Sequence, residues 1–163
     1  MVRRPLPRSG SPPAQIVPRG ALITVWVVVN LVNLLQATGF ATRVIDPGIN
    51  RTLGIGIMAL GVPAGFALIS FVRAKSGWRF DLGPALFLVF VITELVVDHL
   101  LMLEFRSPRR TEILIPYLTL FFGSIVLMGA PMIRINRRLW TVTAITTLIL
   151  LGAMGFAMAR GVG

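Results

Sequence analysis

Residues 84–103 read PALFLVFVITELVVDHLLML, and this stretch decides the fold class. Twenty residues in an α-helix cross about 30 Å of hydrocarbon. Its thirteen Leu, Ile, Val and Phe residues favour insertion by roughly 4 to 8 kcal/mol, and two central acids oppose it by about 5 to 7 kcal/mol. The segment therefore spans a bilayer only if the side that carries Glu94 and Asp98 faces protein.

The rest of the chain repeats this apolar pattern. Of 163 residues, 55% are hydrophobic and 13% are charged, whereas a soluble domain has about 25% charged residues. None of the apolar runs alternates as a membrane strand does. The sequence predicts an all-α, polytopic integral membrane protein with five transmembrane helices. These spans are residues 21–40, 53–72, 84–103, 113–133 and 139–159, within a domain of residues 20–163.

Residues 1–19 differ from the spans in composition. They are rich in Pro and Arg and lack apolar periodicity, so we expect a disordered tail. If the N-terminus is inside, ten of the sixteen basic residues lie inside and six outside. The positive-inside rule then predicts a multi-pass protein of the cytoplasmic membrane, with the N-terminus inside and the C-terminus outside. Because the net charge of +10 flanks apolar runs, the expected partner is anionic lipid headgroups and not nucleic acid.

Polar residues inside the spans indicate a candidate site. Asn30, Asn33 and Gln36 form one stripe on the first span. In an α-helix Glu94 and Asp98 share one face, and His99 points about 100° further round. Helix directions place Asn33 and Gln36 at about the depth of these acids, and Tyr117 falls at a similar depth. We therefore expect one cluster in the outer half of the bundle, formed by Asn33, Gln36, Glu94, Asp98, His99 and Tyr117.

Two interpretations of this cluster remain open. Asn, Gln, Tyr and a carboxyl can hydrogen bond between helices and only fix their packing. Two acids exceed what packing requires, and they also suit a proton or cation site. His99 is expected as a core residue, because the chain has no second His to complete a metal or haem site and no cysteine. We expect no metal and no cofactor.

Three functions follow from these residues. The first is a small transporter or channel-like protein that uses the intramembrane carboxylates. The second is a non-catalytic subunit or scaffold of a membrane complex, or a homo-oligomer. The third is an intramembrane lipid-modifying enzyme. In that case Asp98 and His99 would act together with Arg106, Arg109 and Arg110, which would contact an anionic ligand or headgroup. Ordinary flanking charge is the favoured explanation of these three arginines. No motif assigns a catalytic residue, so the enzyme ranks last.

Overall fold

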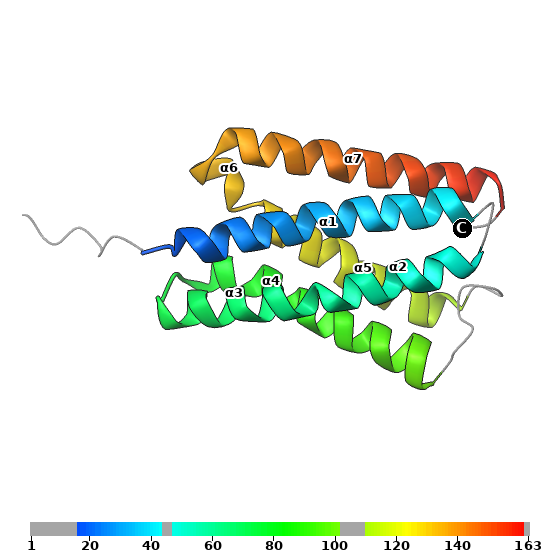
Figure 1. The fold of residues 1–163 in the computed structure, drawn as a ribbon, viewed down its shortest axis with the longest axis horizontal. Helices are drawn as coiled ribbons and strands as arrows, with labels where there is room; N and C mark the ends of the chain where they lie inside the picture. The colour runs from blue at the N-terminus through cyan, green and yellow to red at the C-terminus, as the bar shows by residue number, and fades with distance from the viewer. Residues whose placement is uncertain (1–15, 44–46, 102–109, 162–163) are drawn as a thin grey trace, which may run out of the picture.

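The computed structural model describes residues 16–43, 47–101 and 110–161, without the side chains of residues 47, 48, 50, 51, 98 and 99 (Figure 1). Within these ranges every regular element is helical. The elements are α1 (Arg19–Arg43), α2 (Pro47–Ala59), α3 (Gly61–Arg73), α4 (Trp78–Glu94), the π-helix η1 (Leu95–Leu100), α5 (Thr111–Gly129), α6 (Met132–Ile135) and α7 (Arg137–Ala159).

The predicted all-α class and the five apolar segments are confirmed. Five helical stretches are long and apolar enough to cross a membrane, and each has 20 to 25 residues. They are Arg19–Arg43, Thr52–Arg73, Trp78–Val97, Thr111–Ile135 and Arg137–Ala159. Large apolar side chains such as Val62, Phe66 and Leu148 are more than 60% exposed on their outer faces. In water such a surface would be costly, whereas lipid makes it ordinary.

Two helix pairs build most of the bundle. The largest interfaces join α1 to α7 and α4 to α5, and α1 also packs on α2 and α3 (Figure 1). The shared core is aliphatic on α1 and aromatic on α4 and α5. Its fully buried members include Val28, Val29, Val32, Phe87, Phe90 and Ile125. Asn136 caps α7, because its side chain accepts hydrogen bonds from the backbone N–H groups of Arg138 and Leu139.

The second and third spans differ from the expected ranges. The second is broken at Leu60, between α2 and α3. The third begins at Trp78 and not at Pro84, which lies buried inside α4. The turn before α4 has positive φ at Lys75 and Gly77, 51° and 94°, and this left-handed geometry ends the preceding helix. Proline is tolerated inside membrane helices because neighbouring groups satisfy the freed backbone.

The N-terminal segment and the fourth span also differ from the sequence-based expectation. Residues 1–15 lie outside the described part of the chain. Residues 16–18 contact the bundle, because Ser76 Oγ donates to the backbone oxygen of Ile16 over 3.0 Å and Val17 packs against the core. The fourth span divides into α5 and the short α6, which is anchored by the fully buried Met132.

Gly83 sets the distance between α4 and α5. A Cβ atom on Gly83 would lie 2.6 Å from the backbone nitrogen of Met128 and 2.8 Å from the carbonyl carbon of Leu127. Only glycine allows the two backbones to approach this closely. Gly61 also allows a close approach, between α3 and α4, but with less constraint. A Cβ atom on Gly61 would lie 3.3 Å from a methyl group of Val91 on α4.

Candidate functional site

Glu94 is a buried acid in the apolar part of the bundle. It is the last residue of α4, and only 6% of its surface is exposed. The phenol of Tyr117, on α5, donates a hydrogen bond to Glu94 Oε2. Tyr117 is itself 7% exposed. We refer to these two residues as the carboxyl–phenol pair.

Aromatic rings and a glycine surround this pair. The Phe90 ring, one turn before Glu94, lies 5.2 Å from the Tyr117 ring and 5.1 Å from the Phe121 ring, centroid to centroid. On the side of α2, a Cβ placed on Gly54 would lie 3.8 Å from Glu94 Oε1. Three helices thus meet at one carboxyl group.

A π-helix follows directly after Glu94. The backbone N–H of Leu101 donates to the oxygen of Val96, five residues earlier, over 2.8 Å. In η1 the α-helical spacing expected for Glu94, Asp98 and His99 does not hold, because each turn includes one additional residue. The backbones of Asp98 and His99 belong to η1, and their side chains lie outside the described part of the structure. Short π-helical segments occur frequently at functional sites.

A second polar group lies between α1 and α7. Its members are Asn30, Asn33, Thr143, Thr146 and Thr147, which we refer to as the amide–threonine network. Asn30 Nδ2 donates to Thr143 Oγ1 (3.1 Å), and Thr146 Oγ1 donates to Asn30 Oδ1 (2.8 Å). Asn33 Nδ2 lies 3.0 Å from both Thr146 Oγ1 and Thr147 Oγ1. Every bond in this network is between neutral groups.

One buried polar atom of this network has no hydrogen-bond partner. Asn33 is fully buried, and its Oδ1 atom has no hydrogen-bond partner. Asn30, in contrast, uses both ends of its amide, because its Nδ2 also reaches the backbone oxygen of Trp26 at 2.7 Å. The two asparagines therefore differ in how completely they are satisfied, although they lie one turn apart on the same helix.

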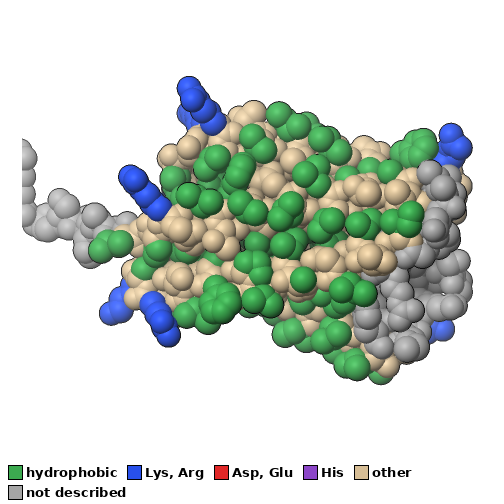
Figure 2. Space-filling model, in the orientation of Figure 1, with side chains coloured by type: hydrophobic (Ala, Val, Ile, Leu, Met, Phe, Trp, Pro, Cys, Tyr) green, Lys and Arg blue, Asp and Glu red, His purple; other side chains and the backbone are tan. Residues whose placement is uncertain are grey.

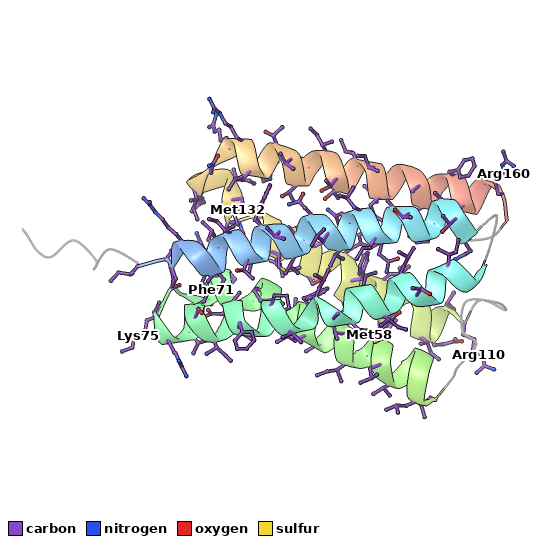
Figure 3. The ribbon with its side chains drawn as sticks, viewed as in Figure 1. Met58, Phe71, Lys75, Arg110, Met132 and Arg160 are labelled. Atoms are coloured by element: carbon purple, nitrogen blue, oxygen red, sulfur yellow. The ribbon has the colours of Figure 1, made fainter. Side chains whose placement is uncertain are left out.

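The residues predicted to form one cluster have their hydrogen bonds at two separate interfaces. Glu94 and Tyr117 join α4 to α5, whereas Asn33 joins α1 to α7. Gln36 is half-buried and makes no hydrogen bond within the described residues. Arg110 is exposed just before α5 (Figure 3). Arg106 and Arg109 lie outside the described residues, as do the side chains of Asp98 and His99.

Sequence reasoning missed the threonines of α7. Thr143, Thr146 and Thr147 recur at the spacing of one helix face, which is the same signal that identified the asparagine stripe on α1. It also missed Trp26, whose indole N–H donates to the backbone oxygen of Leu139 over 2.9 Å. These contacts join residues about 113 positions apart, so α1 and α7 run parallel with a constant offset.

The chemistry of the site follows from its groups. Among the described residues, no cluster of three His, Cys, Asp or Glu side chains is placed to hold a metal ion. The carboxyl–phenol pair can change its proton content, because a carboxyl group ionises and a phenol both donates and accepts hydrogen bonds. The amide–threonine network has no group that changes charge between pH 5 and 8.

Comparison with known proteins adds no family. No protein-family model matches the chain, and no curated protein sequence or solved structure matches it either.

Proposed function

We propose that the chain is a small transporter or channel-like protein in which Glu94 binds a proton or a small cation within the membrane. The observation that carries this proposal is the buried Glu94 carboxyl, paired with the Tyr117 phenol where α4 changes into a π-helix. An ionisable group inside a membrane segment is costly and commonly marks an ion or proton path. Asp98 and His99, on η1, are the next candidates along such a path.

The pairing with Tyr117 suits a group that gains and loses a proton. When Glu94 is ionised, the phenol donates to the carboxylate. When Glu94 is protonated, its hydroxyl can donate to the phenol oxygen instead. In both protonation states a hydrogen bond can join the two side chains. A packing contact does not require this property.

The π-helix supplies an element that can move. A return of η1 to α-helical hydrogen bonding would rotate the following residues by about 100° relative to Glu94. Such a change would alter which residues lie beside the carboxyl without breaking the α4–α5 interface.

The charge distribution supports an orientation in the cytoplasmic membrane with the N-terminus inside. With the N-terminus inside, ten of the sixteen basic residues of the sequence fall inside and six outside. Of the ten whose side chains the structure describes, seven lie at the end that holds the start of α1 and three at the other end. On the face drawn in Figure 2, Lys and Arg occur at the two ends and not over the apolar middle. The first set is Arg19, Arg73, Lys75, Arg79, Arg134, Arg137 and Arg138; the second is Arg43, Arg110 and Arg160.

Reconstitution in proteoliposomes tests the proposal. Entrapped pyranine would report proton entry, and an entrapped sodium-sensitive dye would report sodium entry. We expect wild-type protein to conduct one of the two ions and Glu94→Gln to reduce flux to that of empty vesicles. Glutamine keeps the shape of the side chain and cannot ionise. Glu112→Gln is the matched control, because Glu112 is an exposed acid at the start of α5.

The outcomes separate the hypotheses. Glu94→Gln must fold like wild-type protein for its flux to count, and the melting temperature in detergent checks this. Wild-type flux of both ions no faster than that of empty vesicles would contradict the transporter proposal, as would equal flux in Glu94→Gln.

The second candidate is a non-catalytic subunit of a membrane complex. The amide–threonine network and the close crossing at Gly83 favour it, because both join helices without any ionisable group. This candidate predicts no flux and a stable partner that copurifies in mild detergent.

A further inference from the structure

We propose that the basic end of the bundle is a docking surface for anionic phospholipid headgroups. The basic end is defined by the seven residues Arg19, Arg73, Lys75, Arg79, Arg134, Arg137 and Arg138, and all seven are exposed. They come from three places, which are the start of α1, the α3–α4 turn and the α6–α7 turn. This inference is independent of any transport at Glu94.

Little negative charge balances this end. Of the three acids whose side chains the structure describes, only Asp81 lies here, in the first turn of α4. One carboxylate oxygen of Asp81 is buried without a hydrogen-bond partner, so it is turned away from solvent. The exposed guanidinium groups therefore face outward with their donors available, and a guanidinium pairs with a phosphate through two parallel hydrogen bonds.

Apolar side chains stand beside these cations. In the α6–α7 turn, Ile133 and Ile135 are 45% and 46% exposed on either side of Arg134. Trp140 and Trp78 are also exposed, and the Trp78 ring lies 5.7 Å from the guanidinium carbon of Arg79. Tryptophan beside Arg or Lys is the usual composition of the layer between acyl chains and headgroups.

This arrangement favours a lipid over a soluble acidic partner. The apolar outer surface continues up to the basic end, where Trp78, Ile133 and Ile135 are exposed and Lys75 projects from the α3–α4 turn (Figure 3). In a bilayer, lipid phosphates surround this level of the protein at high local concentration. A nucleic acid or an acidic protein could reach only the outermost cations. The anionic leaflet of a cytoplasmic membrane has the complementary charge.

The intrinsic fluorescence of the tryptophans can report which lipids contact the basic end. All three of its tryptophans lie near the basic end: Trp26 bonds to Leu139 at the start of α7, Trp78 begins α4, and Trp140 is in the first turn of α7. Lipids with brominated acyl chains quench tryptophan fluorescence on contact. Their quenching therefore measures which lipid occupies positions beside these residues.

The experiment compares brominated phosphatidylglycerol with brominated phosphatidylcholine at equal mole fractions in vesicles of both lipids. We expect phosphatidylglycerol to quench wild-type protein more strongly, with a several-fold higher relative association constant that falls as salt rises. The variant R137Q/R138Q should lower this ratio toward one. R110Q/R160Q removes the same charge at the opposite end and should leave the ratio unchanged (Figure 3).

A third variant guards against misfolding or inverted insertion. R137K/R138K keeps the charge, so it should keep most of the preference for phosphatidylglycerol. Equal quenching of wild-type protein by the two lipids would overturn the proposal. An equal drop in R110Q/R160Q would do so as well, because the effect would then come from net charge. Binding of a labelled polynucleotide to protein in phosphatidylcholine vesicles, without lipid preference, would point to nucleic acid instead.

Discussion

The α1–α7 and α4–α5 interfaces hold the same bundle together with different chemistry. Between α1 and α7, amides and hydroxyls form a ladder of neutral hydrogen bonds. Between α4 and α5, aromatic rings and the crossing at Gly83 provide the packing, and one carboxyl–phenol bond is added at the end of α4. The first interface uses polar groups to fix the helices in place. The second is already fixed by shape, so its buried acid is not needed for packing.

Under the proposed function, this difference separates the polar residues that join helices from the acid that binds the ion. Neutral hydrogen bonds between membrane helices contribute on average about 0.6 kcal/mol each, up to about 1.7. A buried carboxyl costs free energy that an apolar residue of similar volume would not. The proposed ion site gives a reason for this cost at Glu94, which lies beside Tyr117 at the start of a π-helix. Helix packing alone does not.

The largest expected change in stability comes from the α4–α5 interface, which depends on close packing at Gly83. Gly83→Ala would place a methyl group 2.6 Å from the backbone of Met128, where no side-chain rotation can relieve it. Overpacking of this kind costs about 3 kcal/mol, and we expect the variant to lose most of its folded population. Gly123→Ala, on α5 with open space around it, is the control. Unfolding in increasing sodium dodecyl sulfate measures both, and equal midpoints would break the account of the α4–α5 crossing.

A smaller effect is expected for the amide–threonine network. A double-mutant cycle with Asn30→Ala and Thr146→Val isolates the bond from Thr146 Oγ1 to Asn30 Oδ1. We expect a coupling free energy of about 0.6 to 1.7 kcal/mol, measured by the same unfolding assay. The cycle of Asn30→Ala with Thr141→Val is the comparison, since Thr141 is exposed and bonds only to the backbone of Arg137. A coupling near zero for Thr146 would show that the ladder contributes nothing.

The smallest expected effect distinguishes the two asparagines. Asn33→Leu removes two hydrogen bonds and also the unpaired Oδ1 atom, whereas Asn30→Leu removes an amide that is satisfied at both ends. Asn33→Leu should therefore lower the free energy of unfolding less than Asn30→Leu does, by about 1 kcal/mol. If Asn33→Leu proves the more costly substitution, Asn33 Oδ1 is hydrogen bonded in the folded protein and the expected difference is wrong.

Hydropathy and periodicity were enough to predict the apolar helices and the depth of the polar residues within them. Runs of about twenty apolar residues identified all five segments, and helix direction placed Glu94 and Tyr117 at a similar depth, where the structure joins them. The asparagine stripe was visible, but its partners were not. A single sequence does not say which helices are neighbours, and α7 follows α1 by more than a hundred residues.

The close approach at Gly83, the start of α4 and the π-helix could not be predicted from the neighbouring residues in the sequence. The role of Gly83 appears only when the backbone of Met128 lies against it. Pro84 is a plausible helix start by its chemistry, yet the positive φ at Gly77 moved that start to Trp78. The π-helix at Leu95–Leu100 changed the spacing on which the expected face of Glu94 and Asp98 was based, and no signal in the residues announced it.

Ion flux through Glu94→Gln and Asn33→Leu, measured in parallel in vesicles of the same composition, decides whether Glu94 carries the ion. We expect Glu94→Gln to fold normally and to carry no proton or sodium flux, while Asn33→Leu is less stable and conducts at the wild-type rate per folded molecule. Equal flux in Glu94→Gln and wild-type protein, or loss of flux only in Asn33→Leu, would contradict this expectation.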